Sequence, residues 1–138
     1  MYAICVESSH YKGMGHFFRM LSFIEYLQKR DEKYTVFINN DRVSTSILEQ
    51  KKINYELVNY ADVETNWEKI LIKKYEIKIW INDRLNTEKT HAKNVINNQI
   101  PVITFDDKGS GAELADINFG GLEFENITNL KGKKVFIG

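Results

Sequence analysis

The stretch "YAICVESSHYKGMGHFFRMLSFIEYL", residues 2–27, decides the fold of this chain. It begins with the apolar run "YAICVE" (2–7), which predicts a short buried strand. Two glycines follow, and from residue 15 to residue 30 apolar side chains recur at spacings of three and four, as on one stripe of a helix. A strand, a glycine turn and an amphipathic helix in this order are typical of the first unit of an α/β domain.

The rest of the chain repeats this alternation of strands and helices. The further strands are expected at 34–39, 54–59, 77–83, 100–107, 115–121 and 133–138, and the further helices at 41–52, 63–75 and 86–98. Asp41 and Thr87 stand where helix caps are expected. Because most of these strands are near-continuous apolar runs, they predict a mostly parallel sheet that is covered on both faces. We therefore expect a doubly wound, Rossmann-like α/β domain.

The composition is that of one soluble domain. The chain has 138 residues, 43% of them hydrophobic, and a formal net charge of zero, so nothing in it indicates a nucleic-acid-binding protein. Its single cysteine, Cys5, lies inside the first apolar run, which favours a core position over a catalytic one. No signal peptide and no apolar stretch of membrane-spanning length is visible. We expect a cytoplasmic protein without a membrane span.

Polar residues gather where the expected strands end. They are Glu7, Ser8, Ser9 and His10, then Asn39–Asp41, then Asn82–Arg84, and finally Asp106 and Asp107. In an open parallel sheet, ligands bind beyond the carboxyl ends of the strands, so these residues are candidates for one site. Alternatively, they are polar only because strand ends are exposed. Of the last pair, we expect Asp107 to face the site and Asp106 to support nearby backbone, because adjacent strand residues point to opposite faces.

The glycine turn does not carry a known cofactor fingerprint. "GMGHFF" (13–18) has the first two glycines of G-x-G-x-x-G, but Phe18 takes the third position, which disfavours a dinucleotide. No G-x-x-x-x-G-K-[ST] motif is present, which excludes a P-loop. Three scattered histidines and one cysteine give no metal-ligand spacing. We expect no cofactor and no metal.

The turn does suit a polar or anionic ligand, because glycines let a ligand approach the backbone and the helix start offers free N–H groups. His16 lies in the first turn of the expected helix, where the helix dipole disfavours a protonated ring, so it suits a general base. The alternative is an ordinary helix-start histidine that bonds nearby backbone. His10 could touch a ligand from the loop, whereas His91 is expected to be a solvated surface side chain. The candidate substrate-binding residues are Ser8, Gly13, Met14, Gly15, Arg19, Asp83 and Asp107.

Three motifs in order resemble a known family. "GMGHFFRMLSFIEYL" matches G-x-G-H-x-x-R-x-L before an apolar helix, "PVITFDD" matches a strand that closes on a double aspartate, and "ADINFGG" matches the short strand after it. Together they resemble the amino-terminal domain of the nucleotide-sugar hydrolases of pseudaminic acid synthesis and the related spore-coat polysaccharide proteins. Both belong to the GT-B group, which includes the MurG-like glycosyltransferases.

This resemblance implies a reaction and a partner. It implies two Rossmann-like domains that face each other across a cleft, the carboxyl-terminal one holding most of the uridine diphosphate. It also implies that His16 is the base that activates water against the anomeric carbon of a UDP-sugar, with Gly13 and Gly15 shaping the loop. On this interpretation residues 1–138 are the acceptor-side domain, and a carboxyl-terminal domain or a companion subunit supplies the nucleotide contacts. The domain alone would then be inactive or nearly so.

One departure from the family pattern keeps other functions open. The hydrolases carry a D-x-Y element after the fourth strand, whereas this chain has Asp83 followed by Leu85. A glycosyltransferase that uses a sugar hydroxyl in place of water is therefore the second hypothesis. A non-catalytic Rossmann-like module that binds a ligand or a partner is the third. The chain also ends on an apolar strand and a glycine, which we interpret as a cut within a longer architecture or as a strand that closes the sheet.

Overall fold

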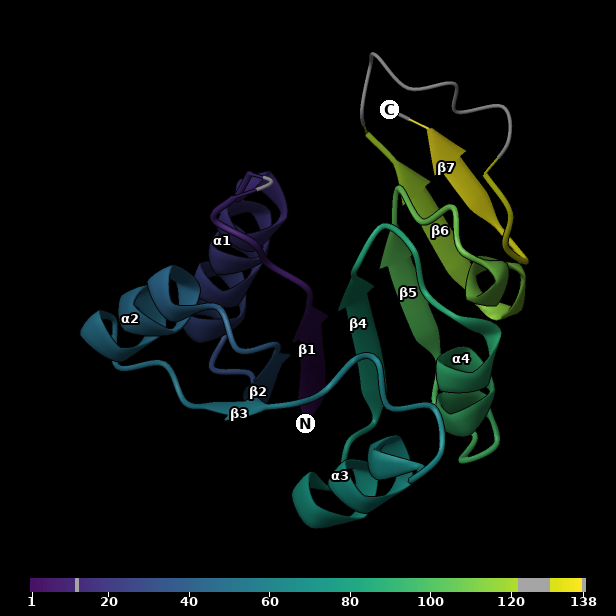
Figure 1. Ribbon diagram of the computed structural model, residues 1–138, viewed down its shortest axis with the longest axis horizontal. Coiled ribbons are helices and arrows are strands. Elements are labelled where there is room, and N and C mark those ends of the chain that lie inside the picture. Colours follow the sequence, from purple (N-terminus) through teal and green to yellow (C-terminus); the bar gives the residue numbers. More distant parts are fainter. Residues whose placement is uncertain (12, 122–129, 138) are drawn as a thin grey trace.

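The computed structural model of this chain describes residues 1–11, 13–121 and 130–137. In the described residues, the strands form one parallel sheet of seven strands in the order β3-β2-β1-β4-β5-β6-β7 (Figure 1). The strands are β1 (Tyr2–Val6), β2 (Tyr34–Ile38), β3 (Tyr55–Leu57), β4 (Ile79–Asp83), β5 (Val102–Phe105), β6 (Ile117–Gly120) and β7 (Val135–Ile137). The expected Rossmann-like, doubly wound α/β fold is confirmed.

Helices cover the two faces of this sheet. They are α1 (Gly15–Lys29), α2 (Arg42–Gln50), α3 (Trp67–Tyr75), α4 (Lys89–Ile96) and the short 3₁₀ helix η1 (Ser110–Leu114). In Figure 1, α1 and α2 lie together on one side of the sheet, and α3 and α4 lie on the other. Two separate apolar cores result, one under α1 and α2 and one under α3 and α4.

The alternation of side chains along β1 supplies both cores. Ile4 and Val6 point into the core under α1, whereas Ala3 and Cys5 point into the core under α3 and α4. All four are buried, which explains why this strand is a continuous apolar run rather than an alternating one. The α1 stripe that fills the first core is the one predicted from spacing; it comprises Phe17, Met20, Leu21, Ile24 and Leu27.

The order of the strands places a crevice at the middle of the sheet. The chain starts at β1, runs outward through β2 to β3, and then returns to β4 on the other side of β1. From β4 it runs outward again through β5 and β6 to β7. The winding therefore reverses between β1 and β4, and in open α/β sheets the carboxyl ends of the strands at that reversal form the ligand crevice.

Most expected elements are found, with ends that differ by a few residues. The Asp41 cap is confirmed, because its carboxylate accepts the Ser44 N–H at 3.2 Å. The Thr87 cap is wrong: α4 begins at Lys89, and Thr87 is held instead by the ends of two strands. Asn66 adopts a left-handed conformation (φ 50°), so α3 begins at Trp67 rather than at 63. Gly138, the last residue of the final expected strand, lies outside the described residues.

None of the helices in the described part of the chain combines the length and the hydrophobicity that crossing a bilayer requires.

Candidate functional site

His16 and Asp83 meet at the crevice between β1 and β4. His16 comes from the first turn of α1, and Asp83 is the last residue of β4, whose side chain is fully buried. His16 Nδ1 lies 2.9 Å from Asp83 Oδ1. Because an ionised carboxylate only accepts hydrogen bonds, Nδ1 is the nitrogen that carries the proton of a neutral ring. One terminal nitrogen of Arg19 also lies 3.3 Å from Nδ1, but that nitrogen donates to Asp83 Oδ1 at the shorter distance of 2.8 Å. Nε2 then keeps its lone pair, and it has no hydrogen-bond partner among the described residues.

Arg19 completes this pair from the next turn of α1. Its Nε donates to Asp83 Oδ2 and one terminal nitrogen donates to Asp83 Oδ1, both at 2.8 Å, so the guanidinium binds the carboxylate in a bidentate manner. The other terminal nitrogen donates to Asp106 Oδ2 at 2.9 Å. Burial alone would lower the pKa of Arg19, but the hydrogen bonds and charges of Asp83 and Asp106 outweigh it and raise that pKa above its ordinary value. The guanidinium therefore stays charged and fixes Asp83 in position for His16.

Of the two roles predicted for the aspartates after β5, that of Asp106 as a support of nearby backbone is confirmed, and that of Asp107 is wrong. Asp106, which adopts a left-handed backbone (φ 48°), turns its side chain to Arg19 and also accepts the Gly121 N–H at 2.7 Å. Asp107 does not face the site: it is buried and accepts the N–H groups of Thr87 and Gly109 at 3.0 and 2.9 Å. The left-handed turn at Asp106 is the physical reason, because it ends the strand alternation on which the prediction depended.

The glycine turn lies beside His16, as expected. Gly13 has φ 108°, a conformation that favours glycine, and it forms an isolated antiparallel bridge with Ser9. Gly13 and Gly15 are exposed, and Met14 is half-buried at the start of α1. That these three residues contact a substrate stays a prediction.

Two other predicted binding residues are not open to a ligand. Asp83 is covered by His16 and Arg19, so it acts on the site through them. Ser8 is buried, its hydroxyl lies 2.7 Å from that of Ser44, and its backbone exchanges two hydrogen bonds of 2.8 Å with the Asn39 side chain. Ser8 therefore fixes the loop after β1 instead of lining the crevice.

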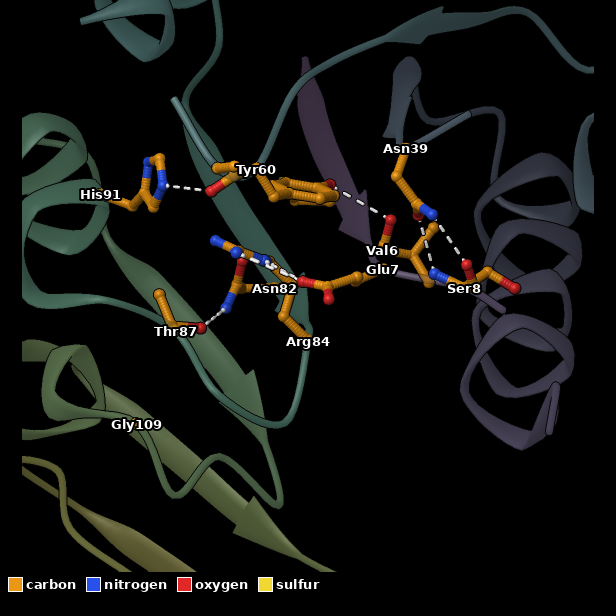
Figure 2. A network of polar contacts seen from close by, with 12 residues as sticks. Val6, Glu7, Ser8, Asn39, Tyr60, Asn82, Arg84, Thr87, His91 and Gly109 are labelled. Atoms are coloured by element: carbon orange, nitrogen blue, oxygen red, sulfur yellow. Dashed lines mark hydrogen bonds and ion pairs between the residues drawn. The ribbon is translucent and has the colours of Figure 1, made fainter. Parts of the chain in front are cut away.

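A second polar cluster lies under the sheet, on the face of α3 and α4 (Figure 2). Arg84, which follows β4, stacks its guanidinium 3.9 Å from the centre of the Tyr60 ring and reaches Glu7 at 3.3 Å. The Tyr60 hydroxyl shares its one proton between the backbone carbonyls of Phe37 and Val6, at 2.8 and 3.1 Å, and lies 3.0 Å from the Cys5 sulfur. This cluster ties the end of β1 to the loops on either side of it.

Cys5 and His91 belong to this buried side. Burial raises the pKa of the Cys5 thiol to about 12, which agrees with its predicted core position. The prediction that His91 is solvated is wrong: its Nδ1 lies 2.6 Å from Glu68 Oε2, and its Nε2 donates to the Tyr60 carbonyl at 2.9 Å. Glu68 lies on the neighbouring helix α3, and the polar sequence around His91 gave no sign of this partner.

An open groove continues from Arg19 across the free face of β5, β6 and β7. It has a volume of about 630 Å³, and its walls are Phe23, Phe105, Phe119 and Phe136 with the glycines at the end of β6. The rings of Phe105, Phe119 and Phe136 stack in a row, each 5.5 Å from the next. These residues are cross-strand neighbours in the sheet, a relation that becomes visible only once the register is known.

The described residues contain no group of three or more His, Cys, Asp or Glu side chains that could hold a metal ion. No protein family model, no curated protein and no solved structure matches this chain.

Proposed function

We propose that this chain is the acceptor-side domain of an enzyme that acts on a UDP-sugar in the synthesis of surface polysaccharides or nonulosonic acids. The observation that carries the proposal is the orientation of His16. Its Nδ1 is held by the buried carboxylate of Asp83, while its Nε2 has no partner among the described residues and the side chain is 23% exposed. A neutral imidazole held in this way is the general base that activates hydroxyl nucleophiles in many hydrolases.

In the proposed reaction, water attacks the anomeric carbon of the sugar. As the new C–O bond forms, one water proton passes to Nε2 of His16. The bond from the anomeric carbon to the phosphate oxygen breaks, and UDP leaves with the electron pair. The imidazolium that forms is stabilised by Asp83, which Arg19 holds in place, and the proton is then released to solvent.

We propose that the nucleotide is held by a second α/β unit, either a carboxyl-terminal domain or a companion subunit. The charges around His16 support this division of labour. Among the described residues, two carboxylates, Asp83 and Asp106, surround the guanidinium of Arg19, so this part of the cluster has no excess positive charge for a diphosphate. This cluster therefore suits the attacking hydroxyl group better than the phosphate groups of the nucleotide.

A glycosyltransferase is the second candidate, and the apolar groove favours it. The groove begins at Arg19, so a bulky acceptor with its hydroxyl at His16 has space to lie along the phenylalanine row. The same base would then deprotonate a sugar hydroxyl in place of water.

The experiment is a measurement of UDP release by the full-length protein from a panel of UDP-sugars, with and without added sugar acceptors. In ¹⁸O-labelled water, hydrolysis places the label on the free sugar, whereas transfer yields an unlabelled glycoside. His16→Asn keeps a donor for Asp83 but removes Nε2, and it should reduce the rate by roughly 10²–10⁴. Release that needs no His16, or no release from any UDP-sugar, contradicts the proposal and favours a non-catalytic binding module.

A further inference from the structure

His10 forms a second histidine–carboxylate pair on the other side of β1. Its Nδ1 lies 2.6 Å from Asp41 Oδ1, and its backbone N–H donates to the same oxygen at 3.3 Å. Asp41 caps α2, and His10 lies in the loop that leads from β1 to α1. His10 thus precedes α1 and is held by the cap of α2 after β2, whereas His16 lies in α1 and is held by the last residue of β4.

A chain of hydroxyl groups fixes Asp41 as an acceptor. The Ser44 hydroxyl donates to Asp41 Oδ2 at 2.5 Å. The Ser8 hydroxyl lies 2.7 Å from the Ser44 hydroxyl, and because the Ser44 proton is already used, Ser8 is the donor in that contact. Burial alone would raise the pKa of Asp41, but hydrogen bonds from Ser44 and then from His10 outweigh it and lower that pKa. Asp41 is therefore ionised at neutral pH, and the proton of a neutral His10 ring lies on Nδ1.

The second nitrogen of His10 is as available as that of His16. Among the described residues, His10 Nε2 has no hydrogen-bond partner, and the side chain is 31% exposed. Both histidines therefore present a lone pair from a ring that a buried carboxylate orients.

The register of the sheet shows that the two pairs flank the end of β1. Val6, the last residue of β1, is paired with Ile38 of β2 on one side and with Asp83 of β4 on the other. Asp83 is the last residue of β4, and Asp41 follows the end of β2, so the two carboxylates come from the two strands that border β1. Both α1 and α2 cover the same face of the sheet (Figure 1), and His16 lies in the first turn of α1 while Asp41 caps α2.

We infer that His10 and His16 together recognise one polyhydroxylated ring, with His10 accepting a hydrogen bond from a hydroxyl group remote from the reacting centre. Two lone pairs backed by carboxylates attract hydroxyl donors and repel anions, so the ring is a neutral carbohydrate rather than a phosphate. This inference rests on the proposed function, and it makes His10 a residue that determines which sugar is accepted.

The test is a titration of the histidine ring nitrogens in the ¹⁵N-labelled full-length protein, followed by NMR. The probes are glucose, N-acetylglucosamine, N-acetylgalactosamine and, separately, inorganic phosphate. At least one sugar should shift the Nε2 signals of both His10 and His16 in a saturable way, and phosphate should shift neither. If only phosphate shifts them, or if no sugar does, the inference is overturned.

Two matched variants of His10 sharpen the result. His10→Asn keeps a donor for Asp41 and deletes the position of Nε2, so it should weaken sugar binding roughly tenfold, the effect of one lost hydrogen bond. His10→Gln places an amide near the Nε2 position and should restore most of the affinity. In the UDP-release assay, His10→Asn should raise KM and leave kcat nearly unchanged. Unchanged sugar affinity in His10→Asn overturns the inference.

The two proposals fail separately in these assays. If sugar binding depends on His10 while UDP release does not depend on His16, the proposed base is wrong and the recognition site stands. If UDP release depends on His16 while His10→Asn binds sugar normally, the base stands and the role of His10 falls.

Discussion

The two faces of the sheet each hold a histidine on a buried carboxylate, and the two pairs differ at the second nitrogen of the ring. Nδ1 of His16 lies on Asp83, and Nδ1 of His91 lies on Glu68, and both carboxylates are almost completely buried. His91 also donates from Nε2 to the Tyr60 carbonyl, whereas Nε2 of His16 meets no partner within the described part of the chain. The carboxylate orients either ring. The partner of the second nitrogen decides whether the ring is structural or available for chemistry.

The largest expected effect is on activity, where changes to Asp83 and to Glu68 should differ. Asp83→Asn replaces the acceptor of His16 by an amide that can donate to Nδ1, which moves the ring proton to Nε2 and removes the base. UDP release by the full-length protein should fall roughly 10²–10⁴-fold. Glu68→Gln, the same change in the other pair, should leave the rate per folded molecule within a few-fold. Equal losses of activity in both variants would contradict the comparison.

For stability we expect the opposite order, with the change at Glu68 costing more than the change at His16. Glu68 accepts hydrogen bonds from His91 and from Asn94, so Glu68→Gln leaves buried donors facing each other. We expect it to lower the free energy of unfolding by about 1–3 kcal/mol. His16→Asn changes a partly exposed side chain and should cost only about 0.5 kcal/mol. Urea denaturation followed by circular dichroism measures both, and a His16 variant that is the less stable of the two would show that His16 is mainly structural.

The hydrogen-bonded pair of His10 and Asp41 should make the stability of the folded protein depend on pH in the acid range. The pKa of Asp41 is lower in the folded protein than its ordinary value near 3.9, so its contribution to stability is complete above that value and is lost as pH falls through the folded-state pKa. Asp41→Asn, which lacks this titration, should be about 1 kcal/mol less stable than the natural chain at neutral pH. The difference should shrink below about pH 4. A difference that does not depend on pH contradicts an ionised Asp41.

The smallest expected effect concerns Cys5, which lies on the face of the sheet that α3 and α4 cover. Cys5 is buried against Tyr60, and its pKa is raised to about 12, so the folded protein should hardly react with iodoacetamide at about pH 8. In urea the thiol should be labelled at the ordinary rate of a free cysteine, as measured by mass spectrometry. Fast labelling in the folded protein would show that this face opens more readily than its contacts suggest.

Sequence reasoning predicted the fold well because the signals there are local. The apolar run at Tyr2–Val6 and the helical spacing after Gly15 each report on their own segment, and parallel pairing follows from their alternation. The helix cap at Asp41 is similarly local, since cap and capped N–H are three residues apart.

The site was predicted less completely because its contacts join distant segments. His16 and Arg19 could be placed on one helix face from spacing alone. Their partners Asp83 and Asp106 come from other strand ends, and the left-handed turn at Asp106 brings Asp106, rather than Asp107, to Arg19. His91 was misjudged for the same reason, since its partner Glu68 lies on another helix.

The central position of β1 has a consequence for the way the chain acquires its structure. Its neighbour β4 is far away in sequence, for Tyr2 pairs with Ile79. A nascent chain that leaves the ribosome amino terminus first can form α1 early, yet its histidine then has no carboxylate to hold it. Folding must wait for this long-range closure, which is a slow step in parallel sheets. Fragments that stop before Ile79 should therefore remain without a native site, however long they are given to fold.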